Sequence, residues 1–170
     1  VPDPTATISA DDTEICEGGA VLLTSNVQNG TGTTNYQWQF NNAGTWEDVS
    51  GETDPTYLVT LVNAGSYSFR LSITQDAGCN VISNEVSINV VADPVVTVTA
   101  SDEQICESGL AQLSASVSGG AGTTLYQWQE YNGSSWQDIS GEITSTYTSL
   151  PLAVGTYQYR VVITQDAGCV

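Results

Sequence analysis

Cysteine is the residue type in this sequence whose spacing points most directly to chemistry. The four cysteines are Cys16, Cys79, Cys106 and Cys169, and the second pair repeats the first at an offset of 90 residues. No histidine and no Cys-x-x-Cys pair accompanies them, which excludes a Cys–His nucleophile and argues against a metal site. Disulfide bonds are therefore the expected chemistry, and they imply an oxidising, extracellular compartment.

Carboxylates are the second group of side chains that could carry out chemistry. Asp and Glu number 19 against 2 Lys and Arg, so the formal net charge is −17. A glycosidase needs only two carboxylates, but Asp48 and Glu52 recur as Asp138 and Glu142 within one strand-and-turn pattern, which indicates a role in the turn. The sequence also has no GxSxG, P-loop or GxGxxG motif. We therefore expect no enzyme activity.

A calcium site is the alternative use of the acidic residues. Asp12 and Glu17 flank Cys16, Asp93 lies in a predicted linker, and Asp166 lies in a loop predicted to face that junction. Calcium takes about six to eight oxygen ligands, although no DxDxDG loop is present here. The favoured interpretation is a solvated acidic surface that keeps the protein soluble, and no other cofactor is predicted.

The only two cations and two of the four tryptophans recur at equivalent positions. Arg70 and Arg160 point outward from predicted strands, where each forms either a weak surface ion pair or a contact between chains. Trp46 and Trp136 lie in the strand after the predicted core tryptophan. They either pack at a sandwich edge or interface, which we favour, or stack on sugar rings.

The charge and hydropathy exclude two classes of partner. With a pI of about 4.1 the chain has almost no positive charge to neutralise nucleic-acid phosphates or to dock on anionic lipid. No apolar run approaches the length of about 18 residues that a membrane-spanning helix requires. We expect neither nucleic-acid binding nor a membrane span.

The sequence consists of two copies of one unit. Residues 3–80 align on 93–170 without a gap, with 37 identities in 78 positions. The shared strings are ICEGG at 15–19 and ICESG at 105–109, YQWQ at 36–39 and 126–129, and ITQDAGC at 73–79 and 163–169. We therefore predict two tandem domains, over 1–91 and 92–170.

The second copy has no counterpart of residues 81–91, which form a predicted last strand in the first copy. The favoured explanation is that the sequence is a window onto a longer array of repeats. The alternative is that another molecule supplies the strand, as in donor-strand pairing.

Hydrophobic residues recur with a period of two, which is typical of half-buried strands. Tyr67, Phe69, Leu71 and Ile73 share one face, and serines, Arg70 and a threonine share the other. Turn pairs such as Asn-Gly separate the runs. The pattern predicts strands near 5–9, 20–27, 35–40, 45–50, 56–62, 66–75 and 84–91.

Seven short strands per repeat predict an all-β fold of two tandem immunoglobulin-like antiparallel β-sandwich domains, the second without its last strand. Trp38 and Trp128 lie in the third strand, where such a fold keeps its core tryptophan. Tyr67 and Tyr157 open the sixth strand, where a tyrosine corner is expected.

This topology leaves two disulfide pairings open. Bridges within each repeat, Cys16–Cys79 and Cys106–Cys169, would contribute about 4 kcal/mol on the chain-entropy model. They would join opposite ends of a sandwich, about 25 Å apart, whereas a disulfide needs Cα atoms within about 7 Å. A bridge between repeats, Cys16–Cys169, avoids this distance and is slightly favoured, with Cys79 and Cys106 then bonded to further copies.

The order of these motifs resembles the Ig-like repeats of very long surface proteins from Bacteroidetes-type bacteria. The shared elements are ICEG (ICES in the second copy), YQWQ, the W-x-D-x-S-G turn, the G-x-Y strand start and the AGC hairpin, and they cover both copies. The resemblance implies extracellular arrays that act as stalks, adhesins or attachment and gliding fibres, often exported by a type IX route.

From the residues and the resemblance we expect a non-catalytic structural repeat of an extracellular, cell-surface fibre or adhesin. Its expected partners are further copies of the repeat in the same chain and, through self-association, a homo-oligomer or filament. The alternative is a glycan- or surface-binding adhesin module that uses Trp46 and Trp136.

Overall fold

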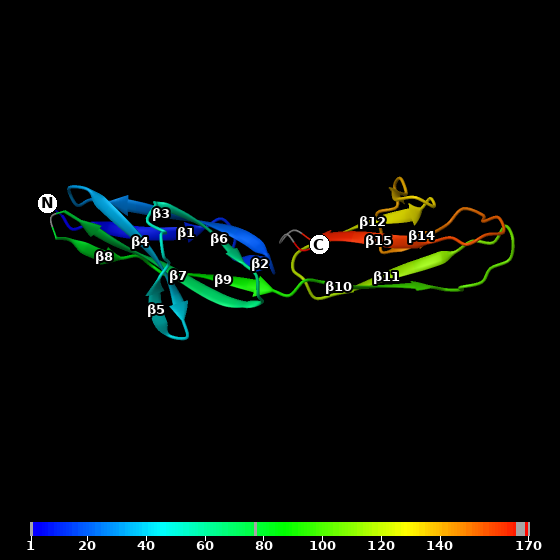
Figure 1. Ribbon diagram of the computed structural model, residues 1–170, viewed down its shortest axis with the longest axis horizontal. Helices are drawn as coiled ribbons and strands as arrows, with labels where there is room; N and C mark the ends of the chain where they lie inside the picture. Colours follow the sequence, from blue (N-terminus) through cyan, green and yellow to red (C-terminus); the bar gives the residue numbers. More distant parts are fainter. Residues whose placement is uncertain (1, 77, 166–168, 170) are drawn as a thin grey trace. The chain divides into compact units, whose positions relative to one another are not determined.

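The period-two pattern of the sequence produces strands throughout. The computed structural model describes residues 2–76, 78–165 and 169, and every regular element in that range is a β-strand (Figure 1). The chain divides into two compact units, residues 1–92 and 93–170. Among the described residues, no helix has the length and apolar character needed to cross a membrane.

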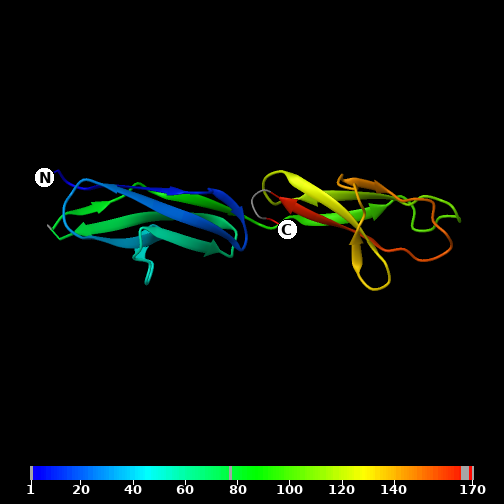
Figure 2. The ribbon, with the colours of Figure 1, turned by 90° about the horizontal axis from the view of Figure 1, so that it is seen from above.

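Unit 1 is a sandwich of two sheets. One sheet has the order β1-β3-β6, and the other has the order β2-β9-β7-β4-β5, with β8 paired to β7 (Figures 1 and 2). The pairs are antiparallel except β2 with β9, which run parallel. The strands are β1 (Thr5–Ala10), β2 (Glu14–Cys16), β3 (Gly19–Gln28), β4 (Thr34–Asn42), β5 (Thr45–Asp48), β6 (Thr56–Leu61), β7 (Gly65–Gln75), β8 (Asn80–Ile82) and β9 (Val86–Val91).

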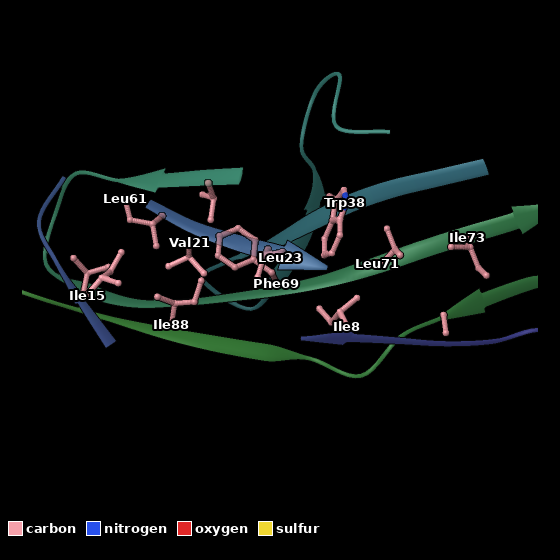
Figure 3. Close-up of a cluster of buried hydrophobic side chains, with 13 residues drawn as sticks. Ile8, Ile15, Val21, Leu23, Trp38, Leu61, Phe69, Leu71, Ile73 and Ile88 are labelled. Carbon is pink, nitrogen blue, oxygen red and sulfur yellow. The ribbon is translucent and has the colours of Figure 1, made fainter. Parts of the chain in front are cut away.

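The core of unit 1 lies between these sheets. Phe69, Leu71 and Ile73 of β7 are 3%, 0% and 0% exposed, whereas the intervening Arg70 and Ser72 are partly exposed. Figure 3 shows them with Trp38 and the buried residues of β1, β3, β6 and β9. Burial at alternate positions is what the sequence pattern predicts for a strand with one face on the core.

A buried tryptophan organises the middle of each unit. Trp38 is fully buried, and its Nε1–H donates to the Asp54 carbonyl at 2.9 Å. The Trp38 backbone N–H donates to the Glu52 carbonyl, and the Trp38 carbonyl accepts from the Val49 N–H. The Gln37 amide donates to the carbonyls of both Trp38 and Val49. These bonds attach the turn at 49–54 to β4. The turn follows β5, so the buried tryptophan also holds this edge strand of the sheet in place.

Unit 2 repeats the central part of this design. Its strands form sheets of order β10-β11-β14 and β13-β12-β15. Trp128 is fully buried, and its Nε1–H donates to the Thr144 carbonyl at 2.9 Å. The strands are β10 (Val95–Ala100), β11 (Gln112–Ser118), β12 (Thr124–Tyr131), β13 (Trp136–Asp138), β14 (Thr146–Thr148) and β15 (Tyr159–Gln165).

The structure confirms the predicted fold class and adds elements that the sequence pattern missed. A strand overlaps each of the seven predicted ranges in unit 1, although β5 ends two residues early and β9 begins two residues late. The expected tyrosine corner is present, because Tyr67 Oη donates to the Asn63 carbonyl at 2.9 Å. Strands β2 and β8 were not predicted. Each has three residues, which is too short to display an alternating pattern.

Replacing Trp38 by Ala should lower the free energy of unfolding of unit 1 by about 3–5 kcal/mol, because it removes a fully buried aromatic side chain. Chemical denaturation followed by circular dichroism measures this change. Trp46→Ala, at a partly exposed position of the same unit, is the matched control and should cost about 1 kcal/mol. Equal losses in the two variants would contradict the central role of Trp38.

Two tyrosines should make unit 2 sensitive to alkali. Burial, together with the negative charge of Glu130, raises the pKa of both Tyr147 and Tyr159 above the ordinary 10.0. Their contribution to stability is complete below pH 10 and is lost as the pH rises through the raised values. Unfolding monitored by circular dichroism alongside tyrosinate absorbance should show this loss, and Tyr147→Phe should weaken it. An unchanged pH dependence in Tyr147→Phe would contradict the assignment.

Candidate functional site

A row of polar side chains crosses the outer face of the larger sheet of unit 1. Asp48 on β5, Gln39 on β4 and Arg70 on β7 lie directly opposite one another in the strand registers. The Gln39 amide donates to Asp48 Oδ1 at 2.7 Å, and Arg70 Nε donates to Gln39 Oε1 at 2.8 Å. The glutamine therefore links the carboxylate to the guanidinium.

The guanidinium also covers an aromatic ring. Arg70 Cζ lies 4.3 Å from the centroid of Trp46, which is on β5 two residues before Asp48 and so on the same face. A cation over the indole face is held by the ring quadrupole. Carboxylate, amide, guanidinium and indole thus form one cluster, which we call the Arg–Trp cluster.

The Arg–Trp cluster recurs in unit 2. Gln129 donates to Asp138 Oδ1 at 2.7 Å, Arg160 Nε donates to Gln129 Oε1 at 2.6 Å, and Arg160 Cζ lies 4.5 Å from the centroid of Trp136. Tyr131 adds a second ring, 5.3 Å from Trp136. The same four residue types at the same strand positions produce the same geometry twice.

Sequence reasoning missed the linking glutamines, although Gln39 and Gln129 recur within YQWQ, and that recurrence was the available signal.

The geometry of the Arg–Trp cluster affects the roles predicted for the arginines and tryptophans. One face of each indole is already covered by a guanidinium, so a sugar would compete for it or use the other face. Contact between chains through Arg70 and Arg160, and glycan stacking on Trp46 and Trp136, stay predictions.

The cysteines are in two different states. Cys16 and Cys169 are disulfide-bonded and only 1% exposed. Cys79 and Cys106 are free thiols, half-buried and exposed respectively. The bridges Cys16–Cys79 and Cys106–Cys169, kept open as the alternative from the sequence, are therefore not formed.

The architecture of unit 1 explains why Cys16 and Cys79 do not form a disulfide. Cys16 lies opposite Val91, near the strand end that also carries Gly65, whereas Cys79 follows the other end of β7. The eleven residues of β7 separate these ends by roughly 30 Å at the usual rise per residue. A disulfide spans less than about 7 Å between Cα atoms, so the two cysteines of unit 1 cannot meet.

Two of the four acidic residues proposed for calcium accept backbone hydrogen bonds. Asp12 Oδ1 accepts from the backbone N–H of Thr13 at 2.7 Å, and Glu17 Oε1 accepts from that of Ala64 at 2.8 Å. Asp93 belongs to unit 2, and Asp166 lies outside the described residues. Within 2–76, 78–165 and 169, no group of three potential metal-ligating side chains is found. The calcium site stays a prediction.

The Arg–Trp contact should be measurable as a coupling energy. Arg70→Gln and Trp46→Leu in unit 1 should each destabilise the unit, and the double variant should lose about 0.5–1 kcal/mol less than the sum of the two. Urea denaturation of the four proteins completes the double-mutant cycle. A coupling energy of zero would mean that the arginine and the indole are merely adjacent.

Comparison with known proteins identifies a family of domains. The family described as a domain of unknown function (DUF8696) matches residues 5–92 and again 95–170. No curated protein matches the sequence.

Two solved structures share the fold. Three N-terminal domains of the Highly Immunogenic Outer Capsid protein of bacteriophage RB49 align with a TM-score of 0.53 and 15% identity over 97% of this chain and 56% of theirs. A Ca²⁺-stabilised adhesin that helps an Antarctic bacterium bind ice aligns with a TM-score of 0.51 and 14% identity over 96% of this chain and 45% of the adhesin. The chain spans about half the length of these structures, and at such identities the likeness concerns the fold alone.

Proposed function

The chain belongs to the DUF8696 family, with one family domain in each unit, and we propose that it is a non-catalytic structural segment of an extracellular bacterial fibre or adhesin. In this proposal the β-sandwich repeats are mechanical elements placed in line along a surface polymer. The fold likeness to a capsid-surface protein and to a bacterial adhesin supports a structural or binding module at a surface.

The observation that carries the proposal is the state of the cysteines. Cys16 of unit 1 and Cys169 of unit 2 are the two oxidised cysteines, while the equivalent positions Cys106 and Cys79 are reduced. We propose that Cys16 and Cys169 bond to each other and so tie consecutive repeats together. In a longer array, Cys79 and Cys106 would make the same bond with further copies, producing a ladder of covalent joints.

Such joints would suit a load-bearing polymer. A linker between domains behaves as a flexible hinge unless additional contacts restrain it. A covalent bond across each junction would restrict bending and would hold the repeats in line under force. Its persistence requires an oxidising compartment, which agrees with the proposed extracellular location.

Self-association into a filament would use the Arg–Trp cluster. Nε of each arginine donates to Gln39 or Gln129, and in this proposal the remaining guanidinium N–H groups donate to carboxylates of an acidic neighbour. With a net charge of −17, lateral contact would need salt to screen repulsion. Glycan binding has weaker support, because the guanidiniums cover one face of Trp46 and Trp136.

Peptide mapping without reduction tests the bridge. After alkylation of free thiols and proteolysis, mass spectrometry should find one cross-linked species containing Cys16 and Cys169, with Cys79 and Cys106 alkylated. A peptide linking Cys16 to Cys79 would overturn the proposed joint.

The mechanical role has a separate test. Small-angle X-ray scattering of the full chain should show a broader range of molecular dimensions for Cys16→Ser than for the parent, while Cys79→Ser, which removes a free thiol, should match the parent. If Cys16→Ser scatters like the parent although the bridge has been mapped, the joint does not stiffen the chain and the mechanical proposal is wrong.

A further inference from the structure

The sequence contains two Asn-Gly pairs, and the structure places them in different surroundings. Asn29-Gly30, followed by a threonine, lies in the loop between β3 and β4. Asn132-Gly133, followed by a serine, lies in the hairpin between β12 and β13. In both pairs the backbone nitrogen after the asparagine can approach the side-chain amide, because glycine has no Cβ to obstruct it. The local chemistry of the two pairs is the same, so any difference in their reactivity comes from the fold.

The side-chain carbonyl of Asn132 is held by two backbone donors. Asn132 Oδ1 accepts from the N–H of Ser134 at 3.0 Å and from the N–H of Ser135 at 3.0 Å. Residues 131–135 are exposed, and the hairpin projects from the rest of unit 2 (Figure 2). Two N–H groups directed at a carbonyl oxygen stabilise the negative charge that develops there when a nucleophile adds to the carbon. The hairpin therefore activates the Asn132 amide toward addition.

The backbone nitrogen next to this amide is accessible. The Gly133 N–H donates to no group within the described part of the chain. A Cβ added at this position would meet no atom within 4 Å, and the φ of Gly133 is 93°, which glycine adopts without strain. Both reacting groups lie in the loop between β12 and β13, so a ring can close between them while the strand pairing remains.

The Asn29-Gly30 pair is restrained by its neighbours. The Gly30 N–H donates to the Pro2 carbonyl at 3.2 Å. Gln75 Oε1 occupies the place where a Cβ of residue 30 would lie, and the Gln75 side chain is only 6% exposed. The Gly30 nitrogen must lose its hydrogen bond before it can react, and the packed glutamine limits the movement of the loop. The fold therefore protects the pair in unit 1 and leaves the pair in unit 2 accessible.

We propose that Asn132 is a site of spontaneous deamidation in the folded protein and that Asn29 is protected from this reaction. The Gly133 nitrogen adds to Cγ of Asn132, a bond forms between them, the Cγ–Nδ2 bond breaks, and ammonia leaves with the proton of the Gly133 N–H. Water then opens the cyclic imide. Cleavage of the new nitrogen–Cγ bond gives aspartate. Cleavage between the nitrogen and the backbone carbonyl carbon gives isoaspartate, in which the main chain runs through Cγ.

Either product places a new negative charge beside the Arg–Trp cluster of unit 2. Trp136 is the first residue of β13, directly after this loop, and its ring contacts Arg160 and Tyr131. Isoaspartate also lengthens the main chain by one carbon at position 132, which removes the geometry of the two bonds to Oδ1 and disturbs the hairpin that carries Trp136. The reaction needs only water and the hairpin, so it is independent of the fibre role proposed above.

Incubation of the full chain at mildly alkaline pH, both folded and unfolded in urea, tests the site by mass spectrometry. Cleavage after Glu130 and Glu142 gives a peptide in which Asn132 is the only asparagine, and fragment ions locate any change at Asn29. In urea the two pairs should deamidate at similar rates, because their local sequences match. In the folded protein Asn132 should react at least about tenfold faster than Asn29, because the Gly30 nitrogen is bonded and covered.

Two variants complete the test. Asn132→Gln should abolish the reaction in this hairpin, because the longer side chain must close a less favoured six-membered ring. Asn42→Gln, at the equivalent position of unit 1, is the matched control and should leave the reaction at Asn132 unchanged. Equal rates at Asn132 and Asn29 in the folded protein, or a faster reaction at Asn29, would overturn the proposal. A reaction at Asn132 more than about tenfold slower in the folded protein than in urea would also overturn it.

Discussion

The buried indole in the third predicted strand of each repeat is the constraint on which the rest of the unit depends. Trp38 and Trp128 are fully buried, and each donates its Nε1–H to a carbonyl sixteen residues further along the chain. A buried indole N–H without a partner would be costly, so this bond fixes the turn after β5 or β13. The fixed turn sets the register of that edge strand, and the register in turn aligns Asp48, Gln39 and Arg70 across three strands.

The two repeats provide a comparison within one molecule. The segments 65–68 and 155–158 have closely similar sequences, G-S-Y-S and G-T-Y-Q, yet only the first is a strand. The difference lies in the partner, because β9 pairs with the first and no described strand pairs with the second. Strand formation at these positions therefore depends on cross-strand contacts more than on local preference.

The acidic surface and the scarce cations have complementary roles. Asp12 and Glu17 accept from backbone N–H groups at turns, and Asp11 accepts from the N–H of Leu22 in β3. Asp76 accepts from Thr33, which lowers the pKa of Asp76. Each arginine is held by a glutamine and an indole in its own unit, and that glutamine donates in turn to Asp48 or Asp138. Most of the negative charge thus remains on the surface, where it favours solubility and opposes association at low salt.

The sequence by itself determined the repeat, the all-β class, the main strands of unit 1 and the burial of Trp38, because internal identity and a period of two are local signals. It also disfavoured disulfides within each repeat, because the length of the strands separates the two ends of a sandwich. Only the tertiary structure decided which cysteines are oxidised and that Gln39 links Arg70 to Asp48. These features depend on which strands lie side by side, and that is decided by contacts between residues far apart in the chain.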